Sequence, residues 1–158
     1  MTKNSNELLY INLKNKKMKV GITFSTFDLF HAGHVKMLEE AKRQCDYLIV
    51  GLQLDPSIDR PEKNGPSQSI IERYIQLKGS KHIDEIVPYV SEQDLEDILR
   101  SFKLDVRIIG EEYKEKNYTG RDYCEEKGIE IYYNSRNHRF SSSGLRKQVK
   151  QAEKINKK

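Results

Sequence analysis

Residues 18–34 read MKVGITFSTFDLFHAGH, and this stretch decides the fold. Its first part, Met18 to Ser25, is apolar and rich in β-branched and aromatic residues, which predicts a strand. From Gly33 to Gln44 the apolar residues follow a helical spacing instead. A strand that feeds through a short turn into a helix is the first half of a β-α-β unit.

The same alternation of strand-like and helix-like segments continues to the end of the chain. Further strands are expected at Asp46–Gln53, Asp84–Val90, Asp105–Gly110 and Ile129–Tyr133, and further helices at Ser67–Gly79, Ser91–Leu99, Thr119–Lys127 and from Ser142 onward. Such alternation predicts an α/β fold with a parallel sheet of about five strands and helices on both faces. Ligands of these sheets bind at the carboxyl ends of the strands, so the site is expected there.

Length and charge limit the possible organisation. The chain has 158 residues, enough for one domain. We expect an N-terminal extension over residues 1–17, one folded domain over 18–150 and a basic tail over 151–158. Lys and Arg number 28 and Asp and Glu 24, a formal net charge of +4. This surplus fits anionic ligands but is too small to argue for nucleic acid.

Other classes of protein are excluded by what the sequence lacks. No apolar run approaches the length of a membrane span, and no signal peptide is visible. The two cysteines, Cys45 and Cys124, share no spacing typical of zinc sites or of a disulfide framework. We therefore expect a cytoplasmic protein with reduced thiols and no membrane partner.

The turn after the first strand carries the most informative pattern, His31-Ala32-Gly33-His34. Two histidines three apart at a helix start can both face one bound group. The helix N-terminus adds free N–H groups and partial positive charge, which suit phosphate oxygens, and a glycine leaves room for a phosphate to approach. A zinc pair is the alternative, but it lacks a nearby third ligand.

Together with Thr26-Phe27-Asp28, this pattern closely resembles the TFDxxHxGH signature of the cytidylyltransferase-like nucleotidyltransferases, and in particular of bacterial glycerol-3-phosphate cytidylyltransferases. Arg136 to Ser143 is similar to the RTEGISTT signature of the same family. The resemblance runs from about Met18 to Gln148 and implies a Rossmann-like nucleotidyltransferase fold. Physically, the serine run offers hydroxyls and N–H groups at a helix start, although ordinary helix capping would also explain it.

The resemblance also implies which residues act. Lys63 matches a lysine that reaches the reacting phosphates, a task that Arg60 could share, and a solvated loop charge is the alternative for both. The catalytic set implied is His31, His34, Lys63 and Arg136. The nucleotide-binding set implied is Thr26, Phe27, Asp28, Gly33, Arg73, Gly110, Glu112, Ser141, Ser142 and Ser143.

The activity implied is transfer of CMP from CTP to a small phosphorylated acceptor, such as glycerol 3-phosphate or a similar polyol or sugar phosphate, with release of pyrophosphate. Mg²⁺ would be carried by the triphosphate, without a metal site on the protein, and relatives are commonly homodimers. Ser25, Ala32 and the pair His138-Arg139 depart from the family pattern. An adenylyltransferase that uses ATP on a sugar phosphate or a flavin mononucleotide therefore stays open. So do a nucleotide sensor without turnover and, more remotely, a nucleic-acid binder.

Overall fold

The structure is a computed structural model that describes residues 17–155. Its strands are β1 (Val20–Ser25), β2 (Tyr47–Gln53), β3 (Glu85–Tyr89), β4 (Val106–Gly110) and β5 (Glu130–Asn134). Its helices are α2 (Ala32–Arg43), α3 (Ile70–Lys78), α4 (Glu92–Ser101), the short 3-10 helix η1 (Glu111–Tyr113), α5 (Arg121–Glu126) and α6 (Ser142–Ile155). The predicted N-terminal extension lies outside the described residues, except for Lys17.

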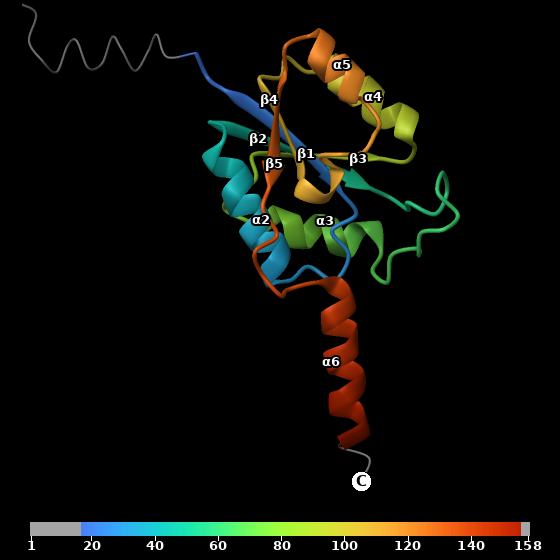
Figure 1. Ribbon diagram of the computed structural model, residues 1–158. Coiled ribbons are helices and arrows are strands. Elements are labelled where there is room, and N and C mark those ends of the chain that lie inside the picture. Colours follow the sequence, from blue (N-terminus) through green and yellow to red (C-terminus); the bar gives the residue numbers. More distant parts are fainter. Residues whose placement is uncertain (1–16, 156–158) are drawn as a thin grey trace, which may run out of the picture.

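The five strands form one sheet in the order β3-β2-β1-β4-β5. Every pair of neighbours is parallel, as predicted. Figure 1 shows α2 and α3 on one face of the sheet and α4 and α5 on the other. The chain builds outward from β1 to β3, then returns to place β4 on the other side of β1. The carboxyl ends of β1 and β4 therefore mark the topological switch point, where ligands of such sheets bind.

Each face of the sheet has its own hydrophobic core. On one face, Leu38 of α2 and Leu77 of α3 pack against Val50 and Val106. On the other face, Leu95 and Leu99 of α4 pack with Ile22, Ile49 and Cys124. Adjacent residues of β2, such as Ile49 and Val50, thus face opposite cores because strand side chains alternate. The continuous apolar run of β2 is explained by burial on both faces.

Helix α3 begins later than the sequence predicts. It starts at Ile70 rather than Ser67, and Ser69 caps it in a reciprocal pair with Glu72. The backbone N–H groups of Ser67 and Gln68 are already bound to the Asp28 carboxylate, at 2.8 and 2.9 Å. These bonds to a residue about 40 positions earlier in the chain hold Ser67 and Gln68 in the loop, so the helix starts after them.

The last helix, α6, runs unbroken to Ile155, across the position where the sequence predicts the basic tail to begin. It projects away from the sheet, and none of its residues is buried (Figure 1). Its first turn, by contrast, reaches the β1–α2 turn. Only the N-terminal end of α6 can therefore contribute to a site at the strand ends.

Candidate functional site at the carboxyl ends of the strands

A cavity of about 710 Å³ lies at the carboxyl ends of the strands. Its wall combines the turn between β1 and α2, the ends of β2 and β4, and the segment between β5 and α6. The sequence-predicted site residues that line it are His31, His34, Lys63, Arg136, Thr26, Gly33, Gly110, Glu112, Ser141 and Ser142. Residues separated by more than 100 positions in the chain thus meet at one cavity.

His31 and His34 hold each other in place at the start of α2. The Nδ1 atom of His31 accepts a hydrogen bond from the Gly33 N–H at 3.0 Å, and the Nδ1 atom of His34 accepts one from the His31 N–H at 3.3 Å. Their rings stack with centroids 4.0 Å apart. Because each Nδ1 accepts, each neutral ring must carry its proton on Nε2. The backbone therefore fixes the tautomer of both rings and leaves two N–H donors.

Both imidazoles are held in the neutral form. Burial, with smaller contributions from the charges of His31 and Arg136, lowers the pKa of His34 to about 4. Burial followed by the charge of His138 also lowers the pKa of His31. At neutral pH the pair accordingly acts as hydrogen-bond donors rather than as cations.

The low pKa of His34 predicts a specific loss of stability in acid. In the unfolded chain His34 takes up a proton near its ordinary pKa of 6.5, whereas in the folded chain it resists protonation down to about 4. Unfolding is therefore increasingly favoured as the pH falls through that window. We expect the free energy of unfolding of the wild type to decline more steeply there than that of His34→Asn. Denaturant unfolding at several pH values measures both curves, and parallel curves would contradict the prediction.

The structure gives Gly33 a packing role beside the predicted one, which is to leave room for a phosphate. A Cβ at this position would lie 2.8 Å from the ring of His31 and 2.8 Å from the backbone oxygen of Phe140. The glycine thus lets the β5–α6 segment pack onto the start of α2. This contact brings the serine run beside the two histidines.

The three serines of the run have separate positions. Ser141 accepts the Gly144 N–H at 3.0 Å, which is the geometry of a helix cap. Ser142 lies 3.2 Å from His31 Nε2 and donates to the backbone oxygen of Asp28 at 3.3 Å. Ser143 does not line the cavity. The run therefore both caps the helix, through Ser141, and lines the cavity, through Ser141 and Ser142.

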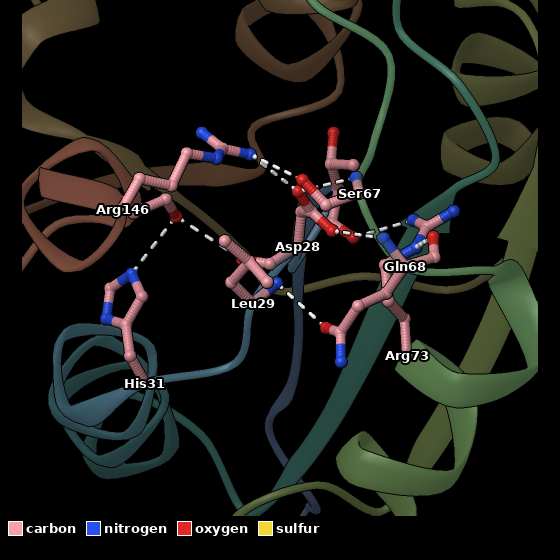
Figure 2. Close-up of polar contacts among 9 residues, drawn as sticks. Asp28, Leu29, His31, Ser67, Gln68, Arg73 and Arg146 are labelled. Atoms are coloured by element: carbon pink, nitrogen blue, oxygen red, sulfur yellow. Dashed lines mark hydrogen bonds and ion pairs between the residues drawn. The ribbon is translucent and has the colours of Figure 1, made fainter. Parts of the chain in front are cut away.

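Phe27 and Asp28, predicted to bind nucleotide, do not line the cavity. Phe27 is buried and has a left-handed backbone, with φ 52°. The Asp28 carboxylate accepts N–H groups of Ser67 and Gln68 and pairs with Arg146 of α6 at 2.8 Å, as Figure 2 shows. Burial raises the pKa of Asp28, but these contacts outweigh it and lower the pKa overall. Asp28 therefore joins the β1–α2 turn to α6 and to the loop before α3.

Arg73 was also predicted to contact the nucleotide, but the structure places it in the core, 1% exposed. Its guanidinium donates to four backbone oxygens, three of which terminate β1 and β2 or follow them directly. These acceptors belong to Gln68, Thr26, Gln53 and Leu54, at 3.1, 2.8, 2.6 and 2.6 Å. Arg73 thereby holds together the ends of β1 and β2 and the segment before α3, but it does not line the cavity.

Arg136 lines the cavity from the segment between β5 and α6. It forms an ion pair with Glu112 of η1, while its backbone N–H donates to Glu111 at 2.9 Å. A Cβ on Gly110 would lie 2.2 Å from the Glu112 carboxylate, so the glycine makes room for that side chain. The segment after β4 thus serves to hold the predicted phosphate-binding arginine.

Sequence reasoning missed one end of the cavity. This end is lined, beside Arg60, by six residues that were not predicted: Gln53, Tyr89, Glu92, Arg107, Tyr118 and Thr119. A signal for part of this set was present, because Arg107 interrupts an otherwise apolar strand, VRIIG. A charged residue in a strand that is buried on both faces needs a partner or a function.

The comparisons with known proteins agree with this geometry. The cytidylyltransferase-like family model matches residues 22–148, from within β1 to the middle of α6. The chain belongs to this family. Family membership confirms the resemblance stated from the sequence, the fold that it implies and the prediction of a nucleotidyltransferase enzyme.

Two relatives of the family carry the name glycerol-3-phosphate cytidylyltransferase. The protein of Bacillus spizizenii is 35% identical over 134 residues, which are 84% of this chain and 98% of that protein. The protein of Bacillus subtilis is 32% identical over 84% of this chain and 98% of its own length. The bifunctional protein HldE of Helicobacter hepaticus is 35% identical over 77% of this chain, but the chain spans only 26% of HldE.

Solved structures share the fold. The lipopolysaccharide core biosynthesis protein from Thermoplasma volcanium superposes with a TM-score of 0.64 at 23% identity, over 77% of this chain and 100% of that one. A pantoate-beta-alanine ligase from Francisella tularensis gives 0.52 at 17% identity, over 90% and 68%. Among residues 17–155, no helix is long and apolar enough to cross a membrane.

Proposed function

We propose that this protein transfers CMP from CTP to a small phosphorylated acceptor, such as glycerol 3-phosphate or a similar polyol or sugar phosphate. The observation that carries the proposal is the pair of neutral, tautomer-fixed histidines that share a cavity with Lys63 and Arg136. Its support from relatives is the 98% coverage of two proteins named glycerol-3-phosphate cytidylyltransferase.

The proposed reaction is an in-line displacement at the α-phosphorus of CTP. A phosphate oxygen of the acceptor forms a bond to that phosphorus, and the bond to the bridging oxygen breaks, so pyrophosphate leaves with the electron pair. A phosphate dianion is nucleophilic at neutral pH, so no protein base is required. Catalysis then consists of positioning and of stabilising charge on the phosphate oxygens.

The residues divide this work by location. His31 and His34 donate their Nε2–H groups to α- and β-phosphate oxygens. Ser142 and the backbone N–H groups at the start of α6 hold the terminal phosphates. Lys63 and Arg136 bring cationic charge to the acceptor phosphate and the α-phosphate. Thr26, Gly110, Glu112 and Ser141 shape the nucleotide side of the cavity.

The proposal also covers the metal ion, the cellular location and the oligomeric state. Mg²⁺ enters as part of the substrate, held by triphosphate oxygens and water. The protein acts in the cytoplasm as a homodimer, without a nucleic-acid or membrane partner. Sedimentation of the full chain tests the dimer, and a monomer at assay concentration would contradict it.

Pyrophosphate release tests the proposed function. The full chain is incubated with CTP, Mg²⁺ and glycerol 3-phosphate, and the product is identified by mass. A CDP-linked product with stoichiometric pyrophosphate is expected. Release with ATP and a sugar phosphate or flavin mononucleotide, but none with CTP, would replace the cytidylyltransferase by the adenylyltransferase alternative.

Lys63→Ala is expected to raise the KM for the acceptor or to lower kcat, because it removes one cation from the reacting phosphates. Its matched control is Lys36→Ala, which removes an exposed lysine on α2 that pairs with Glu39 outside the cavity. Steady-state kinetics compares the two. If Lys63→Ala changes neither constant, Lys63 is an ordinary solvated loop charge.

A further inference from the structure

One end of the cavity is not occupied by the groups proposed to hold the triphosphate. It is built from the end of β2, the loop after it, the β3–α4 junction and the middle of β4. We call it the Arg107 subsite, and define it by Gln53, Arg60, Tyr89, Glu92 and Arg107, all of which line the cavity. It shares the cavity with Arg136 and the serine run, and it spans the end of β1, with Gln53 and Tyr89 on the side of β2 and β3 and Arg107 on the side of β4.

Arg107 carries an uncompensated charge in this subsite. The side chain is 3% exposed, and no ion pair joins it to a carboxylate among residues 17–155. The rings of Phe24 and Tyr118 lie against its guanidinium, which donates to the backbone oxygen of Thr119 at 2.6 Å. Its Nε has no hydrogen-bond partner in the described part of the chain. A buried cation with open donors is unfavourable unless a ligand completes it.

Arg73 shows what a purely structural arginine looks like in the same protein. Its guanidinium is equally buried, but it donates to four backbone oxygens and does not line the cavity. Arg107 donates to one backbone oxygen, faces the cavity and contacts the Cys124 thiol. The two environments differ in unused hydrogen-bonding capacity, which points to a ligand for Arg107.

Two residues near Arg107 in the subsite, Gln53 and Arg60, also have N–H donors without a partner in the part of the chain that the structure describes. Gln53 is 2% exposed, and its Oε1 accepts from Arg60 at 3.2 Å, which orients the amide and leaves its buried Nε2 without a partner. The Nε of Arg60 is also unpartnered. Glu92 is already engaged by Arg60 at 3.5 Å and by the Thr119 hydroxyl. The subsite thus holds one net positive charge and unused donors, a combination that suits an oxyanion.

We propose that the Arg107 subsite binds a carboxylate at the end of the acceptor remote from its reacting phosphate. Among the small phosphorylated acceptors that the proposed function includes, the phosphate ester of a small hydroxy acid is then bound more tightly than that of a neutral polyol such as glycerol. This inference rests on the proposed function, since it assigns the second substrate of the same reaction. It makes Arg107 and Gln53 specificity-determining residues.

The test compares two probes that differ at one carbon. 3-Phosphoglycerate has a carboxylate where glycerol 3-phosphate has a hydroxymethyl group. Titration calorimetry measures the binding of each to the full chain saturated with Mg²⁺ and a CTP analogue that cannot be cleaved. We expect 3-phosphoglycerate to bind about 10- to 100-fold more tightly, the range for hydrogen bonds to a charged group. Equal binding, tighter glycerol 3-phosphate, or binding of neither probe would overturn the inference.

Two variants test whether the preference for the carboxylate arises in the Arg107 subsite. Gln53→Glu keeps the oxygen that Arg60 contacts but replaces the free donor by a negative oxygen, and Arg107→Gln removes the charge. Either is expected to abolish the preference for the carboxylate without weakening the CTP analogue. Arg43→Gln, which removes an exposed arginine paired with Glu39 on α2, serves as control and keeps it. An unchanged preference in Gln53→Glu overturns the assignment even if Arg107→Gln fails to fold.

Pyrophosphate release, measured alongside, separates this inference from the proposed function. Preferential binding of 3-phosphoglycerate without any release leaves the subsite standing and refutes the transferase. Release with glycerol 3-phosphate, combined with equal binding of both probes, leaves the transferase standing and refutes the subsite.

Discussion

His34→Asn is expected to lower kcat by about 100- to 1,000-fold while the protein stays folded at neutral pH. Asparagine places an oxygen where His34 has Nδ1, so it can still accept the His31 N–H that closes the start of α2. It has no atom at the position of Nε2. The variant therefore removes the donor to the phosphates and retains the local cap.

The measurement is kcat from pyrophosphate release, with circular dichroism and the melting temperature as checks on folding. His34→Gln restores an N–H near the Nε2 position and is expected to recover part of the loss. His82→Asn, a histidine outside the cavity, controls for the substitution itself. Near-normal turnover in His34→Asn would remove His34 from the mechanism.

Arg73→Met is expected to cost on the order of 4 kcal/mol of unfolding free energy, which places it among the most destabilising single substitutions. Methionine fills much of the same volume, so the loss is not mainly one of packing. It leaves four backbone oxygens without their donor in a buried or partly buried setting: those of Thr26 after β1, of Gln53 and Leu54 at the end of β2, and of Gln68 just before α3.

Denaturant unfolding measures the change. Arg43→Met, which removes an exposed arginine, is expected to change stability by less than about 1 kcal/mol. Arg73→Lys keeps the charge with fewer donors and should lie between the wild type and Arg73→Met. A value for Arg73→Met close to that of Arg43→Met would contradict the structural role.

Local patterns were sufficient to predict the order of the elements. For α4 the local feature is a pair three residues apart, Ser91 and Asp94, which caps the helix with hydrogen bonds of 2.8 and 3.1 Å. Gly128 has the left-handed backbone (φ 67°) that ends α5. These features depend on residues a few positions apart. The start of α3 was mispredicted because Asp28, about 40 residues earlier, binds the N–H groups before it.

The site shows the same division between local and distant causes. His31 and His34 could be identified because residues three apart at a helix start lie close together whatever the rest of the fold is. The arginines could not be assigned from spacing. Arg73 and Arg107 are both buried, and their roles depend on which backbone oxygens the neighbouring strands place around them. That arrangement exists only after the sheet has formed.

Selective stabilisation by CTP tests the central claim most directly. The melting temperature of the full chain is measured with Mg²⁺ and each of CTP, ATP, GTP and UTP, without an acceptor. A nucleotide at 100 times its Kd adds about 2.7 kcal/mol to the free energy of unfolding, which is a readily measured shift. The account predicts this shift for CTP and much smaller shifts for the other three. Selective stabilisation by ATP, or stabilisation by none of the four, would contradict it.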